Sequence, residues 1–316
     1  MNKERFNELL QASLKSEDTE EWLDVHFNRP IGLAFALASA KLGIKPNTIT
    51  ILSIFLGVAA GVMFSYTDLV HNIMGVILLM FANFGDSTDG QLARLTNQKS
   101  LLGRALDGVS GDVWFFAIYA ALAIRMQGQL IPFTNYHWGI FIWILAFISG
   151  ILCHSTQASL SDYYRQIHLF FLLGKEGSEL DNSAAQREIV KNLPKEKWFD
   201  RLFHSLYGNY CHNQEKRTPN FQRFFEKYKE LKMQADPRIP DVEKELLEGS
   251  RPLMAYTNLL TFNSRAIALY ITALLNCPWV FLLFEIIVLT SFYIHMHHSH
   301  ERLCGRLLAK MEDIKS

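Results

Sequence analysis

The sequence is poor in the features that mark several common protein classes. Its 316 residues carry 31 lysines and arginines against 31 aspartates and glutamates, so the formal net charge is zero. This balance argues against a nucleic-acid-binding protein, which normally shows a basic stripe. The four cysteines are scattered without a C-x-x-C pair, so neither a zinc site nor a disulfide framework is expected. No internal repeat is evident, and the acidic, broken N-terminal segment is not typical of a cleaved signal peptide.

Long apolar segments, in contrast, are abundant. Crossing a bilayer takes about 20 apolar residues, and six segments reach or approach this length. They lie at about 47–69, 72–95, 101–125, 136–163, 257–275 and 278–298. A shorter apolar stretch, residues 31–43, is expected to form an interfacial helix among the lipid headgroups. The predicted fold class is an all-α integral membrane protein with six transmembrane helices, an N-terminal interfacial helix and a helical cytosolic insertion.

The same segments predict how the chain is divided. Residues 1–45 would form a cytosolic arm with the interfacial amphipathic helix, and residues 46–165 the first four spans. Residues 166–255 are polar and would form the cytosolic helical insertion. The last two spans and a cytosolic tail would follow over residues 256–316. Two apolar stripes at helical spacing in the insertion are expected to pack on each other or on the membrane surface, and a lid over a functional site is the alternative.

Lysine and arginine in the connections predict the orientation, because cytosolic loops carry an excess of both. The connection near 66–72 has neither, the one near 125–135 has only Arg125, and the turn at 276–278 has none. The N-terminal arm, the 91–100 connection, the insertion and the tail carry nearly all the basic residues. The chain is therefore predicted to be a multi-pass membrane protein with both termini on the cytosolic side.

Four aspartates lie in one short stretch between two apolar segments, FGDSTDGQLARLTNQKSLLGRALDGVSGD (84–112). An ionised carboxylate at bilayer depth is costly unless a partner compensates it. On a helix, Asp86, Asp89 and Gly90 share one face, and Ala93 returns to it one turn later. The small residues on this face would let a ligand approach the backbone closely.

The next helix repeats this arrangement, with Gly103 and Asp107 at an i, i+4 spacing. Two antiparallel helices that present carboxylates beside small residues offer the hard oxygen ligands that Mg²⁺ or Mn²⁺ requires. Arg94 and Arg104 would neutralise phosphate charge nearby. Purely structural salt bridges are the alternative, but four acids against two arginines leave excess negative charge for a cation to balance.

These residues resemble the signature of the CDP-alcohol phosphotransferase family, D-x2-D-G-x2-A-R-x8-G-x3-D-x3-D. The chain has its first seven fixed positions at the prescribed spacings: Asp86, Asp89, Gly90, Ala93, Arg94, Gly103 and Asp107. The resemblance extends to the interfacial helix, the six spans and a P-N-x-x-T start to the first span, which contains Asn47 and Thr50. It does not extend to the long 166–255 insertion.

The resemblance implies a transferase of phospholipid biosynthesis. An acceptor hydroxyl would attack a phosphate of a CDP-alcohol and release CMP, on the cytosolic side of the membrane. The residues that would hold two divalent ions, Mg²⁺ or Mn²⁺, are Asp86, Asp89, Asp107 and Asp112. The residues that would surround the nucleotide are Gly90, Ala93, Arg94 and Gly103. Asp112 would also act as the general base, Asn47 and Thr50 would help to bind substrate, and a homodimer is implied.

The last aspartate of the signature is displaced by one residue. The pattern places it at position 111, where this chain has Gly111, and the acid is Asp112. On a regular helix this shift turns the carboxylate by about 100°. Gly108 and Gly111 lower the resistance to a π-bulge, which would return Asp112 to the face of Asp107. We therefore predict a distorted helix between the two aspartates, and an impaired site in a non-catalytic scaffold is the alternative.

Two arginines are candidates for binding the acceptor. The segment SLSDYYRQIHLF loosely resembles the one with which some family members bind phosphorylated acceptors, and it would assign Arg165 to an acceptor phosphate. Arg265 is a second candidate, and snorkelling to the headgroups is the alternative for Arg165. Choline and ethanolamine phosphotransferases of the family are generally longer. The donor is therefore expected to be CDP-diacylglycerol and the acceptor inositol phosphate or glycerol phosphate, with headgroup transfer to a lipid alcohol as the alternative.

A transporter is the competing class of function, because intramembrane carboxylates also bind coupling ions. It predicts inverted repeats and acids near the midplane, whereas no repeat is evident and the aspartates crowd one edge. The segment HMHHSH (295–300) offers His295 and His298 as metal ligands on one helix face. It is expected instead to mark the cytosolic exit of the last span.

Overall fold

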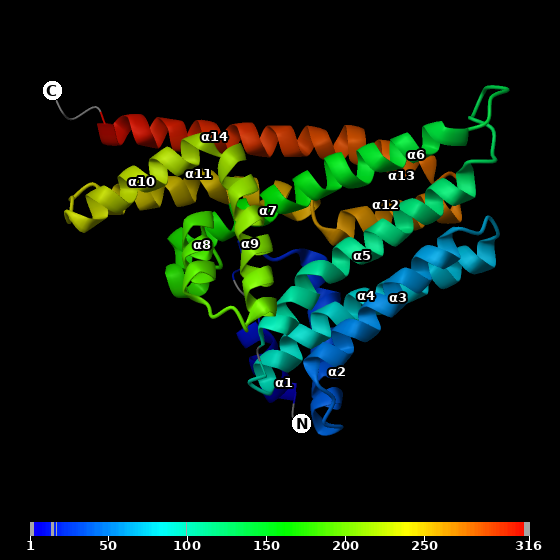
Figure 1. Ribbon diagram of the computed structural model, residues 1–316, viewed down its shortest axis with the longest axis horizontal. Coiled ribbons are helices and arrows are strands. Elements are labelled where there is room, and N and C mark those ends of the chain that lie inside the picture. Colours follow the sequence, from blue (N-terminus) through cyan, green and yellow to red (C-terminus); the bar gives the residue numbers. More distant parts are fainter. Residues whose placement is uncertain (1–2, 14–15, 17, 99, 313–316) are drawn as a thin grey trace. The chain divides into compact units, whose positions relative to one another are not determined.

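The protein is helical almost throughout, so the all-α prediction is confirmed. The structure, a computed structural model, describes residues 3–13, 16, 18–98 and 100–312. It divides into two compact units, Met1–Thr156 with Phe262–Leu289 and Gln157–Thr261 with Thr290–Ser316. Each unit is described by itself below, and Figure 1 gives the helix labels.

Among the described residues, helical segments long and apolar enough to cross a membrane occur five times. They are α3 (Pro46–Phe64), α4 (Leu69–Leu95), α5 (Leu101–Met126), Gly139–Leu173 and Trp279–Glu312. The fourth comprises α6 (Gly139–Phe147), the π-helix η2 (Ile148–His154) and α7 (Ser155–Leu173). The fifth comprises α13 (Trp279–Leu283), the π-helix η4 (Phe284–Leu289) and α14 (Thr290–Glu312). The chain is therefore a multi-pass membrane protein.

The stretch predicted as a span at 257–275 is not among these segments. α11 (Ile239–Leu259) ends just inside it, and α12 (Phe262–Leu274) begins after a short break. α12 has 13 residues, which extend about 20 Å at 1.5 Å per residue. The hydrocarbon core of a bilayer is about 30 Å thick. The break in the helix, which apolar composition does not reveal, shortens this segment.

In the first unit, α3, α4 and α5 lie side by side (Figure 1), and small residues let α3 approach α5 closely. A Cβ atom at Gly57 would lie 2.1 Å from Cδ1 of Trp114, and one at Gly61 would lie 3.0 Å from the carbonyl carbon of Ala117. Contacts between small residues are a main means of helix association in membranes, where no hydrophobic force draws apolar helices together. The glycines of α3 thus fix how closely it packs on α5.

The helix α2 (Arg29–Lys41) forms where an interfacial helix is predicted, and it packs against α4. A Cβ atom at Gly32 would lie 2.6 Å from Oγ of Ser87. Gln91 of α4 donates from Nε2 to the carbonyl oxygen of Arg29 at 3.1 Å. The N-terminal part of the chain is therefore fixed beside the helix that carries two of the aspartates.

Arg125, near the C-terminal end of α5, joins the ends of several helices. Its side chain is buried, and Nη1 donates to the carbonyl oxygen of Phe64 at 3.2 Å and to Oδ1 of Asn72 at 2.8 Å. Nη2 donates to Oδ1 of Asn276 at 2.5 Å. Phe64 ends α3, Asn72 lies in the first turn of α4, and Asn276 follows α12. We call these contacts the Arg125 clamp; they give acceptors to Nη1 and Nη2 of a buried guanidinium, whereas its Nε has no hydrogen-bond partner among the described residues.

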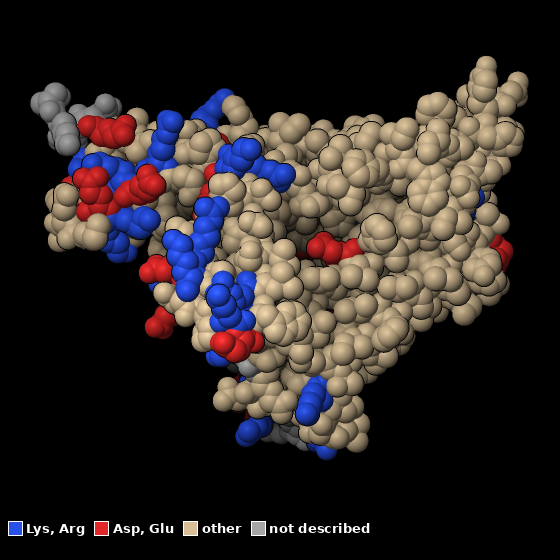
Figure 2. All heavy atoms as spheres, viewed as in Figure 1, with Lys and Arg blue, Asp and Glu red and all other residues tan. Residues whose placement is uncertain are grey.

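The second unit contains most of α7 and α14, together with α8 (Ser183–Asn192), α9 (Trp198–Arg217), α10 (Pro219–Met233) and α11. Lys and Arg side chains gather over its helices, whereas the surface over α3 to α6 of the first unit is nearly uncharged (Figure 2). The apolar stripe of α10 is buried at Phe221, Phe224, Tyr228 and Leu231. The stripe of α9 is exposed at Trp198, Leu202 and Leu206. One of the two predicted stripes is thus covered and the other is not.

Replacing Gly57 by alanine should lower the thermal unfolding midpoint of the detergent-purified protein. The added Cβ atom overlaps the Trp114 ring, and overpacking of this kind typically costs about 1–3 kcal/mol. The matched control is Gly108→Ala in α5, where an added Cβ atom meets nothing within 4 Å. That variant should be neutral or more stable, because glycine inside a helix costs about 0.5–1 kcal/mol relative to alanine. Equal midpoints for the two variants would contradict the close packing of α3 on α5.

Candidate metal centre

Two capped helices carry the aspartate motif. The side chain of Asp68 accepts a hydrogen bond from the backbone N–H of His71 at 3.1 Å and so begins α4. Ser100 begins α5 by accepting from the backbone N–H of Gly103 at 2.9 Å. Such caps give acceptors to first-turn N–H groups that lack a partner within the helix. α3 packs against both helices, and side chains from the C-terminal part of α4 and the N-terminal part of α5 meet at the aspartates.

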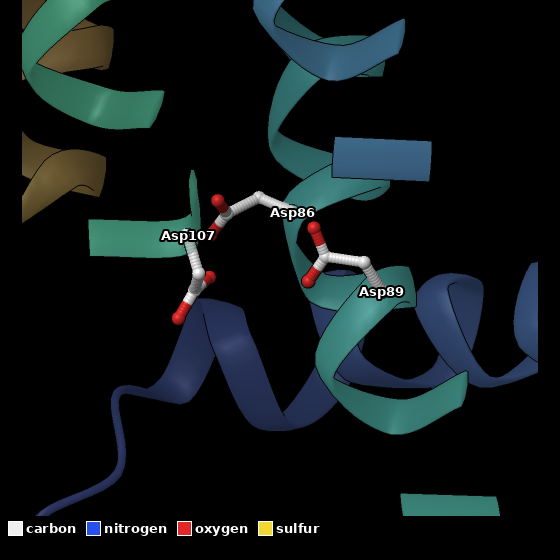
Figure 3. Close-up of side chains that lie close together, drawn as sticks. All are labelled: Asp86, Asp89 and Asp107. Carbon is white, nitrogen blue, oxygen red and sulfur yellow. The ribbon is translucent and has the colours of Figure 1, made fainter. Parts of the chain in front are cut away.

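Three aspartates converge between these helices. One carboxylate oxygen from each of Asp86, Asp89 and Asp107 lies within 4.8 Å of the other two. Figure 3 shows Asp86 and Asp89 pointing from α4 towards Asp107 of α5. Ser110, one turn after Asp107, donates from Oγ to Oδ1 of Asp86 at 2.9 Å. The helix face predicted from the spacing of Asp86 and Asp89 is therefore formed, and the second helix completes it.

The chemistry of this cluster fits a divalent cation. Asp89 is only 4% exposed, and its Oδ2 is buried without a hydrogen-bond partner in the described part of the chain. A buried oxygen without a partner costs free energy, which a bound cation would offset. Three carboxylates this close repel one another, and carboxylate oxygens are the preferred ligands of Mg²⁺ and Mn²⁺. Asp86, Asp89 and Asp107 are therefore the residues that could hold the metal.

Small residues of the motif lie against polar side chains. A Cβ atom at Gly90 would lie 3.6 Å from Nη1 of Arg94, so the exposed guanidinium extends over the bare backbone of Gly90. A Cβ atom at Gly103 would lie 2.9 Å from Oδ1 of Asn47. The structure thus brings Asn47, from the first span, to the start of α5. If Gly103 were replaced by a larger residue, the added side chain would displace Asn47.

Two other predicted binding residues are less accessible. Thr50 is 2% exposed and donates its hydroxyl to the carbonyl oxygen of Pro46 at 3.3 Å. Ala93 is half-buried on α4, one turn after Asp89. Both residues lie on helices of the site, and the Thr50 hydroxyl lies within hydrogen-bonding range of the Asp89 carboxylate.

Asp112 lies apart from the three clustered aspartates. The predicted π-bulge is wrong, because α5 is α-helical without interruption from Leu101 to Met126. No group lies within 4 Å of a Cβ atom at Gly108 or Gly111, so no neighbour forces a distortion there. Five steps of about 100° along a regular helix turn Asp112 about 140° away from Asp107. The exposed Asp112 side chain lines a cavity beside η2 instead.

The two arginines predicted to bind the acceptor have different surroundings. In the second unit, Arg165 is half-buried and donates from Nη2 to Oδ1 of Asn258 at 3.0 Å. Its Nε is buried and has no hydrogen-bond partner among the residues that the structure describes. In the first unit, Arg265 is fully buried, and its Nη1 lies 2.7 Å from Oε1 of Glu285. The positive charge of Arg265 is therefore already balanced inside the protein.

The sequence analysis missed Glu285. It lies in the apolar run FLLFEIIVLT, and an ionisable residue in such a run is a signal that could have identified it. Besides Arg265, the Glu285 carboxylate contacts the hydroxyl groups of Tyr119 and Ser149. These partners come from three different parts of the chain, so no local pattern indicates them.

The histidines of HMHHSH make separate contacts in the second unit. His297 Nδ1 lies 2.6 Å from the Tyr164 hydroxyl, and His300 Nδ1 lies 3.6 Å from Sγ of Cys304. His295 and His298, the two possible ligands, are exposed. Over the described ranges, the aspartate cluster is the one group of three potential ligands that lie this close together.

A family comparison is consistent with this geometry. Residues 44–165 match the model of the CDP-alcohol phosphatidyltransferase family. These residues form a CDP-alcohol phosphatidyltransferase domain. The family is one of transferases, and the match confirms the resemblance on which the aspartate motif was interpreted. The phosphatidyltransferase domain includes the three clustered aspartates, Asp112 and Arg165, and it excludes Arg265 and the insertion. Comparisons with curated proteins and with solved structures gave no match.

Asp89→Asn should weaken Mn²⁺ binding to the purified protein while leaving it folded, because the change removes a charged ligand with little change in volume. The loss should exceed the about 10- to 100-fold typical of losing an outer partner of a metal ligand. Titration of free Mn²⁺ by electron paramagnetic resonance measures it. Asp68→Asn, at the other end of α4, is the control and should bind Mn²⁺ like the wild type. If Asp89→Asn bound Mn²⁺ with wild-type affinity, the cluster would be excluded as a metal centre.

Proposed function

We propose that the protein transfers a substituted phosphate group from a CDP-alcohol to an acceptor alcohol, releasing CMP, in phospholipid biosynthesis. The observation that carries this proposal is the convergence of three carboxylates, Asp86, Asp89 and Asp107, inside a CDP-alcohol phosphatidyltransferase domain. The acceptor oxygen forms a bond to the phosphorus that bears the donor alcohol, and the bond from this phosphorus to the oxygen of CMP breaks. The proton of the acceptor hydroxyl passes to a base.

The chain supplies the groups that such a displacement needs. Asp86, Asp89 and Asp107 would hold two divalent ions, Mg²⁺ or Mn²⁺, which when bound supply positive charge to the diphosphate oxygens and the leaving group. Ser110 keeps the Asp86 carboxylate in place through its hydrogen bond. Arg94 is exposed beside Gly90, where it can pair with a phosphate while the nucleotide approaches the bare backbone.

For the donor we propose CDP-diacylglycerol, and for the acceptor inositol phosphate or glycerol phosphate. Arg165 supports a phosphorylated acceptor, because its half-buried guanidinium has a buried Nε without a partner in the described residues. Arg265, in contrast, is completely buried, and its charge is balanced by Glu285. Headgroup transfer to a lipid alcohol is the second candidate, and the apolar cavity beside Asp112 favours it.

We further propose six spans, with both termini and the aspartate cluster on the cytosolic side, in a homodimer. The connections at 65–68, 127–138 and 275–278 contain no lysine or arginine, which supports placing them on the opposite side. α12 would contribute the sixth span despite its length. The family resemblance supports the homodimer.

Release of CMP from a CDP-alcohol in detergent is the direct test. CDP-diacylglycerol with Mg²⁺ or Mn²⁺ should release CMP when inositol phosphate or glycerol phosphate is added, and chelation of the metal should abolish the release. Asp89→Asn should be inactive in the same assay. Protein that binds Mn²⁺ but releases no CMP from CDP-diacylglycerol, CDP-choline or CDP-ethanolamine with any acceptor would indicate a non-catalytic scaffold.

The roles of Asp112 as general base and as a fourth ligand stay predictions, and one variant separates them. If Asp112 is the base, Asp112→Asn should lower kcat by about 10²- to 10⁴-fold and leave Mn²⁺ affinity unchanged. If it is a ligand, Mn²⁺ affinity should fall as it does in Asp107→Asn. We expect the first result, because Asp112 lies outside the cluster. Full activity in Asp112→Asn would exclude both roles.

A further inference from the structure

A second polar site lies in the first unit, away from the aspartate cluster. Glu285 and Arg265 are both completely buried and form an ion pair at 2.7 Å. The other carboxylate oxygen of Glu285 accepts hydrogen bonds from the Tyr119 hydroxyl and from Oγ of Ser149, the latter at 2.5 Å. Buried ion pairs contribute little stability compared with apolar packing. Ionisable groups inside membrane spans usually serve a function instead.

His154 extends this network to the wall of a cavity. Its Nδ1 lies 2.8 Å from the Tyr119 hydroxyl oxygen. Because Tyr119 donates its only hydroxyl hydrogen to Glu285, the hydrogen between Tyr119 and His154 must belong to Nδ1. Arg265 already balances the charge of Glu285, so the network holds a neutral imidazole. The remaining ring nitrogen, Nε2, then carries a lone pair and can only accept a hydrogen bond.

The backbone around this network is irregular in two helices. Ser149 and His154 lie in the π-helix η2, and Glu285 lies in the π-helix η4. In addition, a Cβ atom at Gly150 would lie 2.7 Å from Cδ2 of Tyr119, so glycine is needed for the ring to approach η2. Short π-helical turns inside longer helices occur frequently at functional sites. The irregular geometry therefore points to the same place as the buried charges.

The cavity beside His154 has a volume of about 490 Å³ and lies between α5 and the α6–η2 segment. Its polar lining consists of Asp112, His154 and Ser155, and no lysine or arginine contributes. Most of the remaining wall is aromatic: Phe115, Phe116, Tyr119, Trp143 and Phe147. In Figure 2 acidic atoms appear in an otherwise uncharged hollow over these helices. An apolar cavity with a few convergent polar groups is typical of a small-molecule site.

We propose that this cavity binds an uncharged amphiphile through a hydroxyl group. His154 accepts the hydroxyl hydrogen at Nε2, the Asp112 carboxylate offers a second acceptor, and the aromatic rings surround the apolar body. Glu285 acts through Tyr119 as a positioning residue that fixes the tautomer of His154. The ligand carries a donor because both side chains are acceptors, and it is uncharged because the cavity lies within two membrane-spanning segments. A lipid alcohol bound here would also suit the second candidate reaction, but the inference rests on the cavity itself, and binding can be measured without any transfer.

Photolabelling of the intact protein in detergent tests the proposal without any CDP-alcohol or metal. The probe is a long-chain alcohol with a diazirine in its chain, and its O-methyl ether is the matched control ligand. The alcohol should label peptides of α5 and α6–η2 roughly three- to tenfold more than the ether, as expected for one net hydrogen bond. His154→Phe should lower this ratio, because only the Asp112 acceptor then remains, and an unchanged ratio would contradict the role of His154. His154→Gln should retain part of it, because its carboxamide oxygen can accept the same hydrogen bond.

Further variants separate positioning from simple structural support. Tyr119→Phe keeps the ring but breaks the link to Glu285, and it should lower the ratio of alcohol to ether labelling. Ala120→Phe fills the cavity and should abolish labelling, whereas Val62→Phe, which adds the same ring on the exposed face of α3, should not. Asp89→Asn should label like the wild type, so failure of the proposed transferase activity leaves this result intact. Equal labelling by alcohol and ether in the wild type, or stronger labelling by a trimethylammonium analogue, would overturn the proposal.

Discussion

Repulsion between three carboxylates within 4.8 Å of one another is the constraint on which the domain depends. At the cluster, the hydrogen bond from Ser110 of α5 to Asp86 of α4 joins the two helices, whereas the like charges of the carboxylates oppose their approach. The helices stay in place through contacts elsewhere, such as the glycines of α3 against α5 and the Arg125 clamp. Packing of apolar helices therefore maintains an electrostatically unfavourable site, and a cation that binds there relieves the repulsion.

Two buried acids of the first unit, Asp89 and Glu285, differ in how many of their carboxylate oxygens have partners. Asp89 keeps an oxygen without a hydrogen-bond partner among the described residues, whereas Glu285 is surrounded by a guanidinium and two hydroxyl groups. A carboxylate oxygen without a hydrogen-bond partner is stabilised most by a positively charged ligand. An acid that is fully satisfied gains nothing from a ligand, but it can fix the orientation of its neighbours. The first arrangement suits metal binding, and the second suits recognition of a neutral molecule.

The fold class and part of the aspartate cluster could be predicted from residue spacing along single helices. The apolar segments predicted the all-α membrane fold, and the i, i+3 spacing placed Asp86 and Asp89 on one face. Features set by neighbouring helices were harder to foresee. The α-helix through Asp112 stays regular because no group presses on Gly108 or Gly111, and the Glu285 network joins residues from distant segments. The break before α12 lies in a run that is apolar on both sides, where composition shows no boundary.

The Arg125 clamp fixes the membrane helices of the first unit to one another at one end only. It joins the end of α3, the beginning of α4 and the end of α5, whereas the aspartates lie towards the opposite ends of α4 and α5. Arg125 and Asp107 are 18 residues apart on one helix, which corresponds to about 27 Å. With one end fixed, any tilt of α5 against α4 displaces atoms in proportion to their distance from the clamp. The spacing of the carboxylates is therefore more sensitive to a change in helix angle than the spacing of residues near Arg125.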